Sequence, residues 1–182
     1  MSYDLWGRLR YVLSPQFDIY EQVAKTVHGY VADIGSGTGL GTHLLARNAD
    51  SVTGFEIDDG ARAFADRTFS NGKVSFQSGD ITKMFSNVKF DFVTMIDVIE
   101  HIRDDYLAVE KAKQVLLPNG TLIISTPNRL SRYRKSDYHV REYAPEELRL
   151  LLNSVFDNVG IADYKLQPLE SEYTNPILAV CQ

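Results

Sequence analysis

Two kinds of apolar pattern alternate along the chain. Short runs of consecutive apolar residues predict buried strands, and stretches in which apolar residues recur every three or four positions predict amphipathic helices. The predicted strands cover residues 30–34, 51–57, 73–78, 90–96 and 121–125, followed by strand-like runs near 155–164 and 177–181. The predicted helices cover residues 16–28, the segment after Gly39, residues 59–70 and 102–116, and a segment that begins at Pro145.

This alternation predicts an α/β fold. Helices of this length between strands imply βαβ crossovers and therefore a mostly parallel sheet. Continuous apolar runs such as 122–125 are typical of strands that helices cover on both faces. The 182 residues hold no internal repeat, low-complexity stretch or linker, so we expect a single domain over 1–182. Residues 1–29 would form an N-terminal arm and the first helix.

A glycine-rich turn follows the first predicted strand. Residues 31–39 read VADIGSGTG, which places Gly35, Gly37 and Gly39 at alternate positions. Glycine has no Cβ and tolerates positive φ, so such a turn lets the backbone approach a ligand closely. The spacing differs from the dinucleotide pattern G-x-G-x-x-G, because Leu40 stands where the last glycine would be.

Acidic residues stand at the ends of four successive predicted strands: Asp33, Glu56, Asp80 and Asp97. A single acid at such a position is usually a cap or turn residue. Ligands of parallel sheets bind at the carboxyl ends of the strands, so four acids there favour a binding site. A carboxylate at Glu56 can accept two hydrogen bonds from ribose hydroxyls.

An acid at Asp80 can accept a hydrogen bond from an exocyclic amine. Ile57 and Ile81 would then supply apolar walls for a flat base. Together with the glycine-rich turn, this pattern indicates a nucleoside-containing ligand.

Several segments resemble the class I S-adenosylmethionine-dependent methyltransferases, in particular the small quinone-biosynthesis-type (type 11/23) subgroup. The segments are VADIGSGTG (31–39), GFEID (54–58), SGD (78–80), FDFVTMIDVIEHI (90–102) and LPNGTLIISTPN (117–128). The resemblance implies a Rossmann-like seven-stranded sheet in the order 3-2-1-4-5-7-6 with an antiparallel last strand. It also implies S-adenosyl-L-methionine as the cofactor, with S-adenosyl-L-homocysteine as the product. The implied cofactor-binding residues are Asp33, Gly35, Ser36, Gly37, Gly39, Glu56, Ile57, Asp80, Ile81, Asp97 and Val98.

Two histidines are candidate general bases for methyl transfer to an O or N atom. His101 follows the fourth strand end, where the acceptor should lie, and the unperturbed pKa of histidine suits proton transfer. His139 is the second candidate, and Glu100 and Asp97 are weaker candidate bases. Both histidines could instead make only local structural contacts. We expect no metal site, because the histidines lack zinc spacing, and a magnesium ion at Asp97 is conceivable but not required.

Residues 126–143 form the most distinctive segment outside the glycine-rich turn. The segment holds five basic residues against two acidic ones, with tyrosines between them. One interpretation is a basic loop over the acceptor side that attracts an anionic acceptor, and the other is a solvated loop. The candidate substrate residues are Arg129, Arg132, Tyr133, Arg134, Tyr138 and Arg141.

Composition narrows the class of partner. The net charge is −5, so no global basic field favours nucleic acid or membrane, and a small-molecule acceptor is the preferred partner. Nucleic acid is disfavoured without being excluded, and the oligomeric state is left open. One cysteine, Cys181, and the lack of a long apolar run favour a cytoplasmic protein. The alternatives are a cofactor-binding scaffold without turnover and a nicotinamide-dependent oxidoreductase.

Overall fold

A seven-stranded sheet forms the centre of the computed structural model, which describes residues 15–83, 88–132 and 136–182. The strand order is β3-β2-β1-β4-β5-β7-β6, and β7 runs antiparallel to both of its neighbours while the other pairs are parallel. The predicted fold class and strand order are therefore confirmed. The strands are β1 (Tyr30–Ile34), β2 (Ser51–Glu56), β3 (Val74–Ser78), β4 (Phe90–Ile96), β5 (Leu116–Thr126), β6 (Val159–Ala162) and β7 (Ile177–Cys181).

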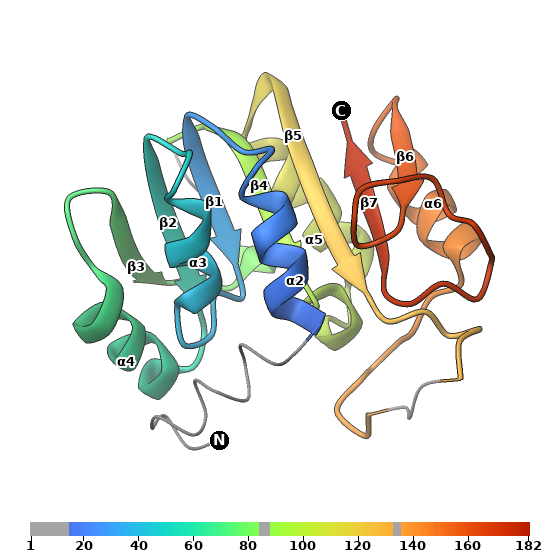
Figure 1. Ribbon diagram of the computed structural model, residues 1–182, viewed down its shortest axis with the longest axis horizontal. Helices are drawn as coiled ribbons and strands as arrows, with labels where there is room; N and C mark the ends of the chain where they lie inside the picture. Colours follow the sequence, from blue (N-terminus) through green and yellow to red (C-terminus); the bar gives the residue numbers. More distant parts are fainter. Residues whose placement is uncertain (1–14, 84–87, 133–135) are drawn as a thin grey trace.

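Helices lie on both faces of this sheet, with α2 and α3 in front of it and α5 behind it in Figure 1. The helices are α2 (Pro15–Val23), α3 (Leu40–Leu45), α4 (Asp59–Phe69), α5 (Asp105–Val115) and α6 (Pro145–Asn153), with short 3-10 helices η1 (Ile81–Lys83) and η2 (Ile99–His101). The predicted N-terminal arm falls within residues 1–14, outside the described part of the chain.

Several boundaries differ from the sequence prediction. The helix expected over 16–28 ends at Val23, and the strand-like run near 155–164 is reduced to β6. The helix expected over 102–116 begins at Asp105, because the side chain of Asp104 accepts a hydrogen bond from the backbone N–H of Leu107 and caps it there. The helix ends before Leu116, which pairs with Phe90 in the sheet. The strand expected to start at residue 121 therefore starts five residues earlier, with a register irregularity opposite residues 90–92.

Alternating side chains of the central strands enter two different cores. Leu122 and Ile124 pack into the core on the side of α5 and α6, whereas Ile123 between them packs with α2 and α3. All three are fully buried. This two-sided burial explains why the strand reads as a continuous apolar run rather than as an alternating one.

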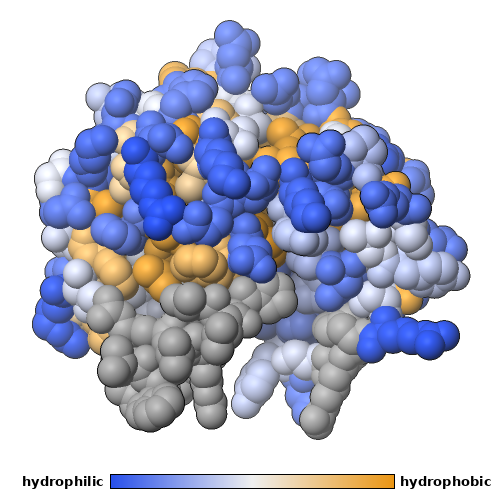
Figure 2. Space-filling view, in the orientation of Figure 1, coloured by the Kyte–Doolittle hydropathy of each residue, from blue (hydrophilic) through white to orange (hydrophobic). Residues whose placement is uncertain are grey.

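The surface is predominantly polar on the face that Figure 2 shows, where hydrophobic residues appear mainly between hydrophilic ones. Within the described ranges, none of the helices combines the length and the apolar character needed to cross a membrane. The carboxyl ends of β1, β2, β4 and β5 meet at one edge of the sheet, at the lower side of Figure 1. The loop after β5 leaves from the same edge.

Two leucines of α6 provide a matched test of this packing. Leu152 is fully buried, whereas Leu150, two positions away on the same helix, is 65% exposed. We expect Leu152→Ala to lower the free energy of unfolding by about 2–5 kcal/mol, since it removes buried methyl groups and leaves a cavity. Leu150→Ala should change it by less than about 0.5 kcal/mol. Urea denaturation measures both, and equal losses would contradict the packing described for α6.

Candidate functional site

The glycine-rich turn joins β1 to α3 through three residues with positive φ. The φ angles are 70° at Gly35, 53° at Gly37 and 86° at Gly39. A Cβ at Gly35 would approach the side chain of Val98 to 2.5 Å, and one at Gly39 would approach the Cβ of Ala65 to 2.7 Å. A Cβ at Gly37 would meet no described atom within 4 Å. Gly35 and Gly39 are therefore required for packing, whereas Gly37 presents bare backbone to open space.

Ser36 lies between these glycines and is buried. Its backbone N–H donates to the carbonyl of Phe55 at 3.1 Å, as does that of Gly35 at 2.8 Å, which fixes the turn against β2. The Ser36 hydroxyl has no hydrogen-bond partner among the residues that the structure describes. The turn thus contains one buried polar group whose hydrogen-bonding capacity the described protein atoms do not use.

Asp33 is fully buried beneath this turn. Its carboxylate accepts hydrogen bonds from the hydroxyls of Tyr20 at 3.0 Å, Thr42 at 2.7 Å and Thr94 at 2.7 Å. Burial raises the pKa of the carboxyl from 3.8 to about 6, and the three hydroxyls oppose that rise. Both oxygens of Asp33 are directed to α2, α3 and β4, so the geometry gives it the role of positioning the turn.

Glu56 connects the end of β2 to the glycine-rich turn. One carboxylate oxygen accepts from the backbone N–H of Gly37 and the other from that of Asp58, both at 2.8 Å. Ionised carboxylate oxygens each accept more than one hydrogen bond, so both retain capacity for a ligand. The next residue, Ile57, is 73% exposed and offers an apolar surface beside the carboxylate.

Asp80 lies at the end of β3 in a local network of hydrogen bonds. It accepts from the N–H and the hydroxyl of Thr82 at 3.0 and 2.7 Å and pairs with Lys83 at 3.0 Å. These interactions, led by the Thr82 hydrogen bond, lower the pKa of Asp80. Ile81 is buried in the hydrophobic core. Of the two predicted apolar walls, only Ile57 therefore presents an open surface.

The end of β4 lies directly against the glycine-rich turn. Asp97 adopts a φ of 54°, its N–H donates to the backbone carbonyl and hydroxyl of Ser125, and its carboxylate accepts from that hydroxyl at 2.8 Å. A non-glycine residue with positive φ is strained, and such strain is concentrated at functional sites. Because Val98 packs at the position where Gly35 lacks a Cβ, the first and fourth strand ends form one continuous region.

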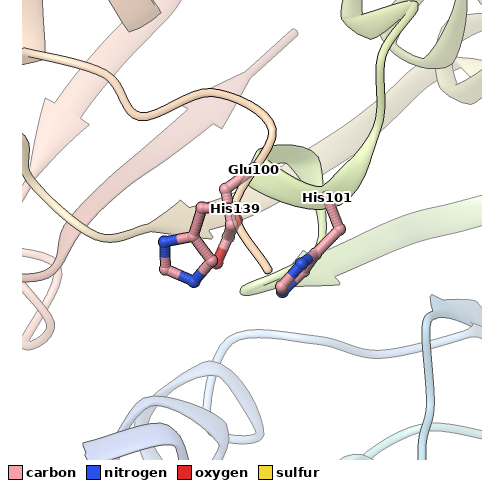
Figure 3. A group of neighbouring side chains, drawn as sticks. All are labelled: Glu100, His101 and His139. Atoms are coloured by element: carbon pink, nitrogen blue, oxygen red, sulfur yellow. The ribbon is translucent and has the colours of Figure 1, made fainter. Parts of the chain in front are cut away.

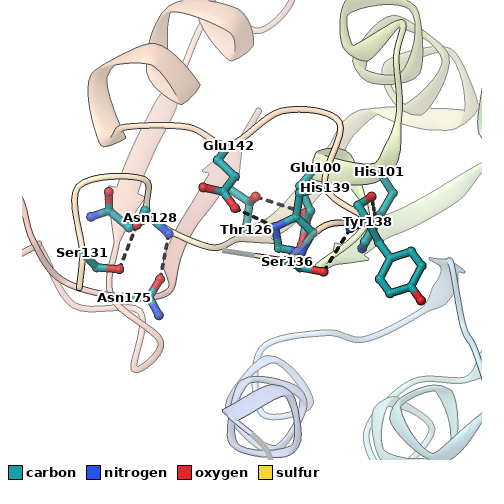
Figure 4. A network of polar contacts seen from close by, with 10 residues as sticks. All are labelled: Glu100, His101, Thr126, Asn128, Ser131, Ser136, Tyr138, His139, Glu142 and Asn175. Carbon is teal, nitrogen blue, oxygen red and sulfur yellow. Dashed lines mark hydrogen bonds and ion pairs between the residues drawn. The ribbon is translucent and has the colours of Figure 1, made fainter. Parts of the chain in front are cut away.

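The two candidate bases lie side by side, although 37 residues separate them in the sequence. The ring centroids of His101 and His139 are 5.0 Å apart with an edge-to-face arrangement. Nδ1 of His101 lies 3.1 Å from the backbone carbonyl oxygen of Tyr138, and Nδ1 of His139 lies 2.8 Å from a carboxylate oxygen of Glu142 (Figure 4). The loop after β5 therefore folds back onto η2.

From the sequence, Glu100 was only a weaker candidate base than the two histidines. It is 1% exposed, and one oxygen of its carboxylate accepts from the hydroxyl of Thr126 at 3.0 Å. Its backbone carbonyl accepts from the N–H groups of Val140 and Arg141 at 2.8 and 3.2 Å. Burial and then the nearby Asp97 carboxylate raise the pKa of Glu100 well above its usual range. The sequence showed it only as an acid inside IEHI, and burial could not be read from that segment.

Two basic residues of the loop after β5 form ion pairs. Arg129 pairs with Glu147 at 2.8 Å, and Arg141 pairs with Asp105 at 2.7 Å. Asp105 also accepts from the hydroxyl of Tyr143 at 2.7 Å, which fixes the loop to the first residue of α5. For these two arginines, the structure favours a structural role over an open anion site.

The other loop candidates are exposed or outside the described residues. Arg132 is exposed, and Tyr138 is 84% exposed. Tyr133 and Arg134 belong to the segment 133–135, which the structure does not describe. Arg132 and Tyr138 are thus the loop residues that a bound acceptor could contact.

Comparison with known proteins identifies the class. A structure of an S-adenosylmethionine-dependent methyltransferase from Clostridium acetobutylicum superimposes with a TM-score of 0.79, over 98% of this chain and 99% of that one, at 15% identity. That likeness shows a shared methyltransferase fold. Residues 32–124, half of the sequence, match the family described as methyltransferase domain, and the chain belongs to that family. The resemblance inferred from the motifs is therefore confirmed.

Curated relatives of the chain also include methyltransferases. A probable S-adenosylmethionine-dependent methyltransferase of Mycolicibacterium smegmatis is 29% identical over 154 residues, which cover 79% of this chain and 59% of the relative. A ubiquinone biosynthesis O-methyltransferase of Actinobacillus pleuropneumoniae is 29% identical over 131 residues, 65% of this chain and 55% of the relative. The chain thus spans less than two thirds of the length of these relatives.

The buried carboxylate of Asp33 should make stability depend on pH. Its pKa is about 6 in the folded protein and near 3.8 when unfolded, so between these values the folded state binds the extra proton. The contribution of Asp33 to stability is therefore fully present below pH 3.8 and is lost as pH rises through 6. One pKa unit corresponds to about 1.4 kcal/mol, which gives a total of roughly 3 kcal/mol.

The variant Asp33→Asn removes this titration while keeping the shape of the side chain. We expect the unfolding free energy of the original protein, relative to that of the variant, to fall by up to about 3 kcal/mol between pH 4 and pH 7. Urea titrations of both proteins at several pH values measure the difference. Parallel stability curves would show that Asp33 has the same pKa in the folded and unfolded states.

Proposed function

We propose that this chain binds S-adenosylmethionine at the edge formed by β1, β2 and β4 and transfers its methyl group to an O or N atom of a small acceptor. The observation that carries this proposal is the bare backbone of Gly37, whose N–H is held by the carboxylate of Glu56 beside open space. Membership of the methyltransferase domain family supports the reaction class.

Different strand ends contact different parts of the cofactor. The turn around Gly37 takes the methionine part, and the Ser36 hydroxyl gains the partner that it lacks among the described residues. Asp97 and Val98 line the methionine end. Glu56 accepts from the ribose hydroxyls through its remaining lone pairs. This division follows the resemblance to S-adenosylmethionine-dependent methyltransferases and fits the arrangement of these groups.

The adenine end lies at β2 and β3. Ile57 supplies the exposed apolar surface for the flat base, and Asp80 at the end of β3 accepts from its exocyclic amine. Both hydrogen bonds from Thr82 reach one carboxylate oxygen of Asp80, and the exposed side chain of Lys83 contacts the other. An adenine ring placed here would span the neighbouring ends of β2 and β3.

The acceptor lies between the methionine end of the cofactor and the loop after β5. The methyl group of a sulfonium is already electrophilic, so the main task of the protein is to align acceptor, methyl and sulfur. A hydroxyl acceptor also has to lose a proton. His101 and His139 stand close enough to each other to serve one acceptor, and Arg132 and Tyr138, on the same loop as His139, are exposed.

Calorimetric titration tests the cofactor. We expect S-adenosylmethionine and S-adenosylhomocysteine to bind with dissociation constants in the micromolar range and NAD not to bind. Binding of NAD alone would indicate the oxidoreductase alternative. Binding of the adenosyl compounds without methyl transfer to any acceptor in a broad panel would support the scaffold alternative.

Two glycines provide the matched variants for this titration. A Cβ at Gly37 or at Gly72 meets no described atom within 4 Å, but of the two only Gly37 has a positive φ and lies beside the proposed cofactor. We expect Gly37→Ala to weaken cofactor binding at least tenfold, because the methyl group occupies the space that the ligand needs. Gly72→Ala should leave affinity unchanged. Full affinity in Gly37→Ala would mean that the glycine-rich turn does not contact the cofactor.

A second variant tests the ribose contact. We expect Glu56→Gln to weaken binding of S-adenosylhomocysteine about tenfold or more, since a charge-assisted pair of hydrogen bonds is lost. Glu110→Gln, on α5 away from this edge, serves as the control. Equal affinities in the two variants would remove Glu56 from the site.

A further inference from the structure

One carboxylate and two imidazoles gather at the edge of the proposed acceptor site. Glu100, His101 and His139 each offer a ligand atom, and these atoms lie within 4.8 Å of one another (Figure 3). Two of the residues belong to η2 and the third to the loop after β5. The three side chains therefore meet through the packing of two separate segments and not through contacts within one element.

The carboxylate of Glu100 lacks a partner on one side. Its Oε2 accepts from Thr126, but Oε1 is buried and has no hydrogen-bond partner among the described residues. A buried acceptor left in this way destabilises the fold, and more so if it is charged. Such groups in folded proteins are usually satisfied by a donor, a water molecule or an ion.

The hydrogen bonds of the two histidines determine which ring nitrogen is free. Nδ1 of His101 faces the carbonyl oxygen of Tyr138, and Nδ1 of His139 faces a carboxylate oxygen of Glu142. Both partners are acceptors, so each Nδ1 carries the proton and each neutral ring keeps a lone pair on Nε2. Metal-binding histidines show this same arrangement, with the second nitrogen donating to a carbonyl or carboxylate oxygen.

Negative charge accumulates around the cluster. The carboxylates of Asp97 and Glu142 both interact unfavourably with that of Glu100. Arg141, whose backbone lies on Glu100, directs its side chain to Asp105 instead. A bound divalent cation would reverse the repulsion among these three carboxylates.

We propose that Glu100, His101 and His139 bind one divalent metal ion of the zinc, manganese or cobalt type. Mixed imidazole and carboxylate ligands suit these ions, whereas magnesium prefers oxygen ligands alone. Three protein ligands leave coordination positions open for a further oxygen atom. The sequence did not indicate this site because one ligand is separated from the others by 37 residues.

The role of the metal rests on the proposed function. Val98, two residues before Glu100, packs against the glycine-rich turn, so a metal ion held by the cluster would lie near the methionine end of the proposed cofactor site. That position would bind a hydroxyl oxygen of the acceptor and promote the release of its proton to water. The oxygen then attacks the methyl carbon while the electron pair of the carbon–sulfur bond passes to sulfur. The products are a methyl ether and the neutral thioether of S-adenosylhomocysteine.

Cobalt(II) titration of the full chain after chelator treatment tests the site directly. We expect one equivalent per chain to produce visible absorption bands, and zinc to displace it. Glu100→Gln, His101→Asn and His139→Asn should each weaken cobalt binding at least tenfold, since each removes a ligand. Glu142→Gln should weaken it by about 10–100-fold through the orientation of His139.

His43→Asn is the matched control, because His43 packs against Phe69 away from the cluster. It should leave cobalt affinity unchanged. Circular dichroism and the melting temperature show which variants fold. If Glu100→Gln does not fold, the cobalt affinity of His139→Asn tests the site instead. Absence of binding, or equal affinity in the control and in the ligand variants, would overturn the proposal.

Acetohydroxamate, which binds open metal positions through two oxygens, tests whether an acceptor oxygen can reach the ion. We expect it to shift the cobalt bands, and unchanged bands would overturn the role in binding the acceptor. Calorimetry with S-adenosylmethionine on the same samples separates the two proposals. Cofactor binding without metal binding would reject the metal site alone, and metal binding without cofactor binding would reject the proposed function alone.

Discussion

The site depends on a charge buried beneath the glycine-rich turn. Asp33 has no contact with water, and it is held by hydroxyls from α2, α3 and β4, three elements that reach it from different directions. A buried carboxylate is tolerated only when donors surround it, so these elements have to take fixed positions around β1. The turn that follows Asp33 is thereby held in place, with the backbone of Gly37 beside open space.

A second connection joins the cofactor side to the acceptor side. The backbone carbonyl of Glu100 accepts two N–H groups of the loop after β5, and His101 and His139 add side-chain contacts across the same junction. The loop is thus held to η2 rather than hanging free over the sheet. η2 directly follows β4, and the end of β4 packs on the glycine-rich turn. A structural change on the cofactor side would therefore alter the acceptor side, and the reverse.

The sequence predicted the sheet and the glycine-rich turn because both depend on local patterns: apolar runs, glycine spacing and acids at strand ends. The start of β5 was missed because Leu116 fits a helical repeat, and its pairing with Phe90 is a tertiary choice. The buried state of Glu100 and the meeting of His101 with His139 depend on a loop returning across the sheet. The periodicity of the sequence does not show that a loop folds back in this way, so these parts of the site could be identified only from the structure.

The pairing of both β5 and β6 depends on β7. β7 lies between β5 and β6 although it follows both along the chain. Until it enters, β5 exposes an unpaired edge, and the unit formed by α6 and β6 has no strand to join. An open edge of apolar residues such as Ile123 invites pairing with another chain. Pairing of β7 is therefore a non-local step that closes an aggregation-prone edge, and slow pairing would expose the β5 edges of newly made chains to one another.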